Sequence, residues 1–126
     1  MSDSRYEFKV EVQSRFLADQ SDPPAGRYAF AYEVRVTNAG TVPAQLVSRH
    51  WVITDANGKI VEVKGLGVVG HQPLLAPGET FEYTSGSQIG TPTGSMRGSY
   101  FCVAEDGERF EAPIAEFALA MPRMLH

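Results

Sequence analysis

The fold of this chain is decided by the stretch Tyr28-Ala29-Phe30-Ala31-Tyr32-Glu33-Val34-Arg35-Val36. Its large apolar side chains occupy every second position. Toward the end of the stretch, the charged residues Glu33 and Arg35 alternate with them. A period of two predicts a β-strand with one buried face. The same pattern occurs earlier in the chain, where the even positions carry Tyr6, Phe8, Val10, Val12 and Phe16.

Further strands are expected downstream, and turn residues separate them. Asp55-Ala56-Asn57-Gly58 and Asp106-Gly107 are typical of hairpin turns, because Asn and Gly tolerate positive φ. The strand before the first turn is apolar on both faces, and alternation assigns one face to Leu46, His50 and Val52 and the other to Val47, Trp51 and Ile53. The expected strands cover residues 44–54, 60–64, a segment around 81–83, 96–105 and 108–119.

Proline and glycine interrupt every potential helix. Residues 19–26, 65–78 and 85–95 are predicted to be mostly loop, since they are rich in Gly, Pro, Ser and Thr. The sequence therefore predicts an all-β protein, a two-sheet antiparallel β-sandwich of about seven to eight strands, immunoglobulin- or fibronectin type III-like, in one domain over residues 1–126. Its core is expected to include or adjoin Tyr6, Phe8, Val10, Phe30, Tyr32, Val34, Trp51, Phe81, Tyr83, Tyr100 and Phe101.

Composition excludes several classes of protein. With 15 acidic and 11 basic residues the net charge is −4, which argues against nucleic-acid binding through bulk charge. One cysteine, Cys102, allows no intrachain disulfide, and it is expected to be a small core residue. No apolar run has the length of a membrane helix, and the first residues lack a signal peptide's apolar region, so the cytoplasm is the expected compartment.

A glycine motif follows the fourth expected strand. Gly65-Leu66-Gly67-Val68-Val69-Gly70 matches G-x-G-x-x-G, but Pro73 and Pro77 prevent the helix that a dinucleotide site needs. What remains is a possible anion nest, with N–H groups of Gly65, Gly67 and Gly70 and positive charge from Lys64, Arg49 or His71. The alternative is that the glycines are conformational only, at positive φ in a bent loop.

Signatures of catalysis and metal binding are absent. No serine stands in G-x-S-x-G, and no two histidines have the spacing of a local metal chelate, so no catalytic residue, metal ligand or cofactor is assigned. A metal site assembled in space from His50, His71 and a carboxylate stays open. Trp51 is expected to anchor the core between the sheets, with Arg49 on its face and His50 on the other.

The middle of the chain resembles the ApaG family. The resemblance rests on Gln45–Trp51, Thr54–Gly58, Gly65–Gly70 and Thr91–Met96, and it extends over nearly the whole chain. It implies a fibronectin type III-like sandwich of unestablished molecular function, associated in bacteria with cobalt resistance and magnesium/cobalt efflux. Family members often carry acidic residues where this chain has Leu66 and His71, which disfavours a carboxylate-dependent metal role for the loop.

The sequence favours a non-enzymatic protein-interaction or accessory module, because exposed strand edges and polar loops suit recognition. Its protein partners are unknown, and a homodimer through an edge strand is expected. The long first strand and the last strand, which contains Pro113, are the candidate edges. The alternative function is weak binding of pyrophosphate or nucleotide phosphates by the Gly65–Gly70 loop, in the micromolar to millimolar range at best, roughly −4 to −8 kcal/mol.

Overall fold

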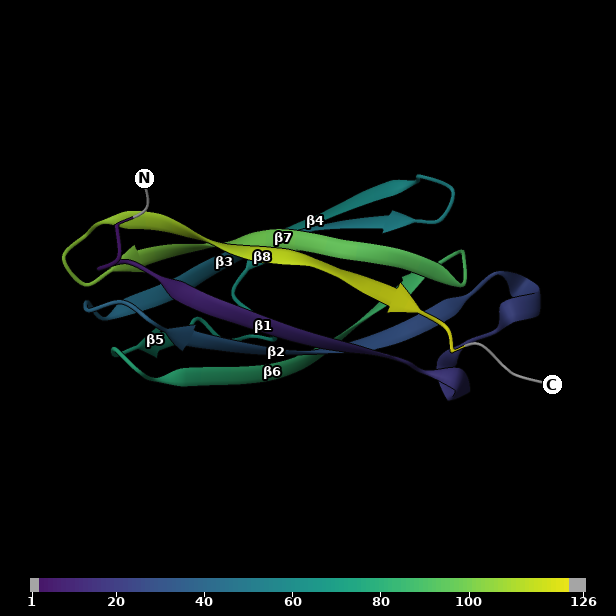
Figure 1. Cartoon of the computed structure of the whole chain (residues 1–126), viewed down its shortest axis with the longest axis horizontal. Coiled ribbons are helices and arrows are strands. Elements are labelled where there is room, and N and C mark those ends of the chain that lie inside the picture. Colours follow the sequence, from purple (N-terminus) through teal and green to yellow (C-terminus); the bar gives the residue numbers. More distant parts are fainter. Residues whose placement is uncertain (1–2, 123–126) are drawn as a thin grey trace.

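The structure, a computed structural model, describes residues 3–122 and consists of two packed antiparallel sheets (Figure 1). One sheet has the strand order β1-β2-β6, and the other has the order β4-β3-β7-β8, with the short β5 paired to β3. The two-sheet sandwich predicted from the alternating pattern is confirmed. The elements are β1 (Phe8–Phe16), 3-10 helices η1 (Ala18–Gln20) and η2 (Pro23–Ala25), β2 (Tyr28–Asn38), β3 (Ala44–Asp55), β4 (Ile60–Leu66), β5 (Leu74–Leu75), β6 (Thr80–Ile89), β7 (Thr93–Ala104) and β8 (Arg109–Ala120).

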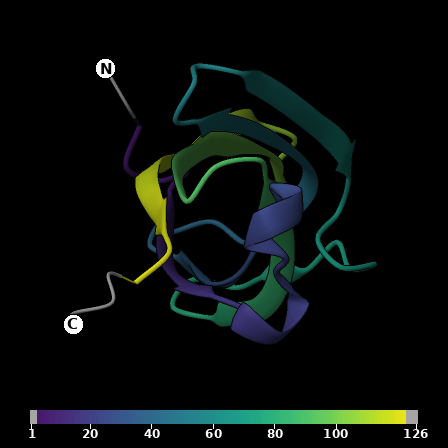
Figure 2. The same cartoon turned by 90° about the vertical axis from the view of Figure 1, so that its right-hand side faces the viewer.

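The core lies between the two sheets, which Figure 2 shows end-on, and it is rich in aromatic side chains. Trp51 is 2% exposed, and its ring lies 5.3 Å from the ring of Tyr32 and 5.9 Å from that of Phe117. Both pairs meet edge to face, the arrangement that the quadrupoles of aromatic rings favour. The predicted anchor of the third strand is therefore confirmed. No helix in the described part of the chain is long and apolar enough to cross a membrane.

A β-bulge in β3 changes which residues face the core. The pairing with β7 shifts between Leu46 and Ser48, so that Val47 is the extra residue. Leu46 is fully buried and shares the core with Trp51, although simple alternation assigned them to opposite faces. That assignment is wrong, because a bulge reverses the parity of every position before it. Phe101 is a second difference: its neighbour Tyr100 takes the core position, and Phe101 is half-buried on the outer face.

Residues 85–95, predicted to be mostly loop, are largely strand. β6 continues to Ile89 and β7 begins at Thr93, which leaves a three-residue connection. The hydroxyl and amide side chains of this segment suggested a loop, but β6 lies at the edge of its sheet, where polar side chains remain in contact with water. Residues 65–78 do form a loop for most of their length, interrupted by β5.

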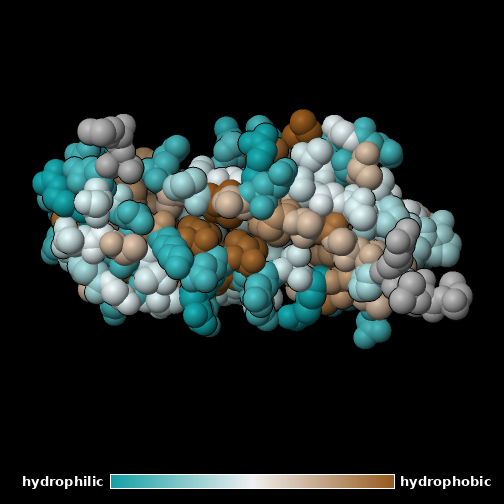
Figure 3. Space-filling model, viewed as in Figure 1, coloured by the Kyte–Doolittle hydropathy of each residue, from teal (hydrophilic) through white to brown (hydrophobic). Residues whose placement is uncertain are grey.

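Both candidate edges, β1 and β8, do lie at the edges of their sheets. They also lie next to each other and close one side of the sandwich. The hydroxyl of Ser14 donates to the carbonyl oxygen of Ala118 at 2.7 Å, and the rings of Phe8 and Phe110 meet at 5.5 Å. In Figure 3 apolar side chains run along the middle of this side, flanked by hydrophilic ones. These two edges therefore shield each other.

Candidate functional site

The glycine motif forms a tight turn that closes on itself. Val68 donates its N–H to the carbonyl oxygen of His71 at 2.8 Å, and His71 returns the bond at 2.9 Å. The two residues between them, Val69 and Gly70, have φ values of 42° and 83°. Positive φ at both central positions is the mark of a type I′ turn. The N–H of Gly67 is also engaged, since it donates to the carbonyl oxygen of Val47 at 2.8 Å.

Arg49 clamps the start of this loop. Its guanidinium donates to the carbonyl oxygens of Leu66 and Gly67, both at 3.0 Å. The group lies directly over Gly65, where an added Cβ atom would come within 2.9 Å of the guanidinium carbon and both terminal nitrogens. Gly65 therefore leaves room for the guanidinium of Arg49, which would have to shift if a Cβ atom were added, and it does not have positive φ. Gly67 is required as glycine for two reasons. It has positive φ, and an added Cβ atom would lie only 2.5 Å from the carbonyl oxygen of His71.

Of the cations assigned to an anion site, Arg49 and Lys64 line one hollow with Gly65, whereas the ring of His71 packs 5.7 Å from that of Phe81. The guanidinium of Arg49 is directed at carbonyl oxygens of the loop. With the N–H of Gly67 engaged as well, the nest contains fewer free donors than the motif suggests. Weak phosphate binding by this loop stays a prediction.

Gly65→Ala is expected to lower the free energy of unfolding by about 1–2 kcal/mol, because the guanidinium must leave two carbonyl oxygens that it now satisfies. Urea unfolding measures the loss. The control is the same substitution in an Arg49→Ala background, where nothing opposes the new methyl group. Equal losses in both backgrounds would show that the clamp is not what selects glycine here.

A shallow hollow lies on the outer face of the larger sheet, beside the clamp. Lys64, His50 and Ser99 form one row across β4, β3 and β7, and Leu66, Ser48 and Phe101 form the next. Nε2 of His50 lies 3.8 Å from a carboxylate oxygen of Glu62 and has no hydrogen-bond partner in the structure. The histidine lies opposite Lys64 of β4 and Ser99 of β7, with Glu62 nearby, and its Nε2 is hydrogen-bonded to none of them.

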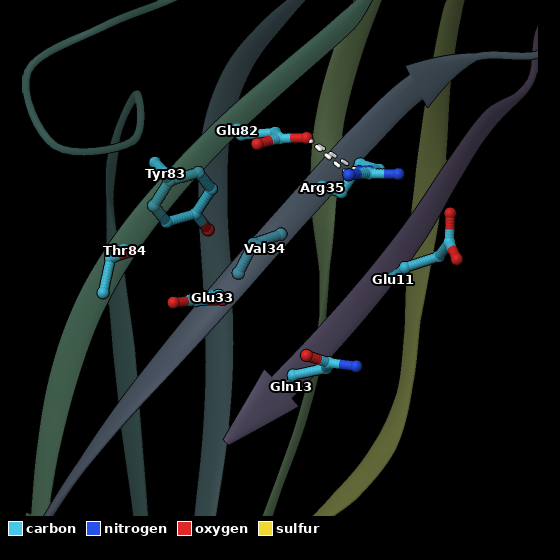
Figure 4. A pocket seen from close by; sticks show the side chains of 8 residues that line it. All are labelled: Glu11, Gln13, Glu33, Val34, Arg35, Glu82, Tyr83 and Thr84. Atoms are coloured by element: carbon cyan, nitrogen blue, oxygen red, sulfur yellow. Dashed lines mark hydrogen bonds and ion pairs between the residues drawn. The ribbon is translucent and has the colours of Figure 1, made fainter. Parts of the chain in front are cut away.

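The smaller sheet carries a second hollow on its outer face (Figure 4). Its polar side chains pair across the strands, with Arg35 donating to Glu82 at 2.8 Å and Arg15 donating to Glu33 at 3.0 Å. Arg35 also lies opposite Glu11 in the strand register, so positive and negative charges alternate across the sheet. Opposite charges facing each other across strands stabilise a solvated sheet face, so these charged side chains have a structural role in the absence of a ligand.

No metal centre emerges from the described residues. Between residues 3 and 122, no three His, Cys, Asp or Glu side chains gather as a metal site requires. His50 lies on the outer face of β3, whereas His71 packs against Phe81 of the other sheet. Cys102 is fully buried, and burial raises the pKa of its thiol to about 12, so it is not a thiolate at neutral pH.

The most exposed apolar surface is a strand edge, named here the β4 edge (Ile60–Leu66). Among residues 3–122, β4 pairs with β3 on one side and with no strand on the other. Its side chains include Ile60, 59% exposed, and Leu66, 75% exposed, and Val61 and Val63 are exposed as well. Sequence reasoning missed this feature, because a short apolar strand has the same pattern at an edge as inside a sheet.

Fold and site together define a small fibronectin type III-like β-sandwich with a glycine loop clamped to its third strand. A family model described as the ApaG domain matches residues 18–104. The Protein ApaG of Ralstonia nicotianae is 69% identical over 98% of this chain and 99% of its own, and that of Thiobacillus denitrificans is 62% identical over 97% and 96%. The crystal structure of a putative ApaA protein from Bordetella pertussis superimposes with a TM-score of 0.92, at 60% identity over 96% of this chain and 98% of that one. The chain belongs to the ApaG family.

Proposed function

We propose that this protein is a non-enzymatic binding module that recognises a protein partner through the β4 edge. The observation that carries the proposal is the edge itself, which combines unpaired backbone groups with exposed apolar side chains. A free edge invites another strand, and soluble proteins ordinarily blunt it with charge, proline or a covering loop. β4 carries two charges of opposite sign, Glu62 and Lys64, and no proline. Strand addition supplies affinity through the main chain and specificity through alternate side chains.

The polar chemistry of the surface supports binding over catalysis. Charged side chains of the smaller sheet neutralise one another, and Arg49 is engaged with carbonyl oxygens of the loop. A catalytic group needs a free acid, base or nucleophile within hydrogen-bond reach of a substrate. At the hollow beside the clamp, His50, Glu62 and Ser99 lie near one another, but Nε2 of His50 forms no hydrogen bond, so these groups are not linked into a catalytic relay.

The association of the family with cobalt resistance and magnesium/cobalt efflux fits an accessory role. In the described range the acidic, histidine and cysteine side chains form no cluster of three that would hold a cation. We therefore infer that any effect of this chain on divalent-cation transport passes through contact with another protein. The partner surface for that contact would be the β4 edge.

Proline at the free edge tests the proposal. The backbone groups of Lys64 point away from β3, so Lys64→Pro removes a donor from the free edge and leaves the β3 ladder intact. Thr84→Pro is the matched control, because Thr84 occupies the equivalent outward position on β6. We expect partner capture from a lysate of the source organism to be lost with Lys64→Pro and kept with Thr84→Pro. Equal capture by both folded variants would contradict the proposal.

The strained tip of the glycine loop adds a separate prediction. Val69 is β-branched and 51% exposed, yet it has positive φ, which costs an L-residue about 1–2 kcal/mol. Val69→Asn creates the Asn-Gly pair that a type I′ turn prefers, and it is expected to raise the midpoint of thermal unfolding by a few degrees. An unchanged or lower midpoint, measured by calorimetry, would show that the turn does not strain Val69.

A further inference from the structure

The four sheet edges are not equally available. β1 and β8 cover each other, as their contacts at Ser14 and Phe8 show. β6 is free, but the residues along its second half are Thr84, Ser85, Gly86, Ser87 and Gln88, which offer little apolar surface. The β4 edge is both free and apolar. A partner strand therefore gains the most at β4.

The direction of the backbone groups along β4 follows from one hydrogen bond. The N–H of Gly67 donates to the carbonyl oxygen of Val47, in line with the β3–β4 register. Antiparallel ladders alternate between hydrogen-bonded and non-hydrogen-bonded pairs. The odd-numbered residues of β4 therefore bond to β3, and the even-numbered ones direct their N–H and C=O groups to the free side. Any strand that adds here must bond to Ile60, Glu62, Lys64 and Leu66, and the carbonyl oxygen of Leu66 already accepts a hydrogen bond from Arg49.

We propose that the strand that adds to β4 is β4 of a second copy of this chain, antiparallel, with the two-fold axis at Val63. The proposal rests on the proposed function and names the partner of the same edge. In this register the two outward-directed sets of backbone groups meet. Each Glu62–Lys64 pair exchanges two hydrogen bonds, and in each Ile60–Leu66 pair the Leu66 carbonyl oxygen, which already accepts from Arg49, would accept a second one. Glu62 lies opposite Lys64 of the second copy, and Ile60 lies opposite Leu66 of the second copy.

The side chains select this register among the symmetric ones. An axis at Glu62 would place Glu62 against itself, and an axis at Lys64 would place Lys64 against itself. Like charges directly opposite each other destabilise a strand pair, and opposite charges stabilise it. The axis at Val63 gives two opposite-charge pairs in each dimer. It also lies at the middle of Ile60–Leu66, so the whole of β4 is paired.

The same register covers the exposed apolar side chains. Ile60 and Leu66, 59% and 75% exposed, face each other on one side of the joined sheet, and the two Val63 side chains meet on the other. A two-fold interface closes on itself and produces a dimer instead of a fibre. Because the interface consists mainly of one strand pair, we expect a weak dimer whose population rises with protein concentration.

A cysteine on the axis tests the register directly. Non-hydrogen-bonded antiparallel pairs place their Cα atoms about 4.5 Å apart, within the range of a disulfide. Val63→Cys is therefore expected to form a covalent dimer under mild oxidation, seen on a non-reducing gel. Val61→Cys is the matched control, because two copies of residue 61 would lie about 13 Å apart. The parent chain is the blank, since its one cysteine, Cys102, is buried.

Charge reversal provides an independent test on the native strand. Lys64→Glu replaces two attractive pairs with two repulsive ones, so the dimer dissociation constant measured by sedimentation equilibrium should rise at least about tenfold. The double variant Glu62→Lys, Lys64→Glu restores opposite charges and should return the constant to within about threefold of the parent. Recovery in the double variant separates pairing from a general effect of either substitution.

The outcomes separate this inference from the proposed function. Cross-linking of Val63→Cys alone, together with rescue by the double variant, supports the two-fold β4 pair. A parent chain that stays monomeric at millimolar concentration, or equal cross-linking of both cysteine variants, overturns it. If the pair is overturned while Lys64→Pro still abolishes capture of a different protein, the proposed function stands. If capture is also insensitive to Lys64→Pro, both fail.

Discussion

Replacing Trp51 with alanine is expected to lower the free energy of unfolding by about 3–5 kcal/mol, the usual cost of truncating a buried aromatic side chain. Trp51 is 2% exposed and touches aromatic rings from β2, β7 and β8, so the lost volume lies where both sheets meet. Neighbouring rings are held by their own strands and cannot fill the cavity. Urea unfolding followed by circular dichroism measures the loss.

Phe101→Ala is the control for this prediction. Phe101 is an aromatic residue of the adjacent strand, but it is half-buried on the outer face of the sheet. Its truncation removes less buried surface and leaves no closed cavity, so we expect a cost below about 1.5 kcal/mol. If Phe101→Ala were as costly as Trp51→Ala, the assignment of the two faces of this sheet would be wrong.

Asn38→Ala is expected to cost about 3 kcal/mol, although the residue is polar and lies at the end of a strand. Asn38 is 1% exposed. Its side-chain amide donates to the carbonyl oxygens of Val42 and Leu75 at 3.0 and 2.9 Å and accepts from the N–H of Gly40 at 2.9 Å. Alanine leaves three backbone groups without this partner, and each such buried group costs about 1–3 kcal/mol.

The same unfolding assay measures this loss, with Asn57→Ala as the control. Asn57 is an exposed residue of the turn between β3 and β4, and we expect its replacement to change stability by less than about 0.5 kcal/mol. If Asn38→Ala lowered the free energy of unfolding as little as Asn57→Ala does, water would have replaced the lost amide. Since Leu75 belongs to β5, the Asn38 substitution should also raise hydrogen exchange along β5.

Much of the fold could be predicted because burial of one face imposes a period of two. The strands around Phe8 and Phe30 followed from that pattern, and Asp106-Gly107 marked the final turn, where Gly107 has a φ of 90°. The bulge at Val47 could not be predicted, since a single extra residue leaves no compositional mark. Residues 85–89 were assigned to a loop because polar composition is shared by loops and edge strands.

The site was harder to predict than the fold, because sheet order is a property of the whole chain. The apolar residues of β4 are visible in the sequence, but their exposure depends on β4 having no second neighbour. The glycine motif attracted a ligand hypothesis, whereas the contact between Arg49 and Gly65 depends on β3 and β4 pairing in one register. Short motifs specify local conformation, and their partners come from distant segments.

The measurement that tests the central claim most directly is amide hydrogen exchange along β4, compared between the dispersed chain and the chain in association with a copy of itself or a captured partner. If recognition occurs by strand addition, the amides of Glu62, Lys64 and Leu66 become protected on association, because their N–H groups point to the free side. The amides of Val63 and Gly65 are already bonded to β3 and should be protected in both states. Fast exchange of the even-numbered amides in the associated state would contradict the β4 edge as the recognition surface.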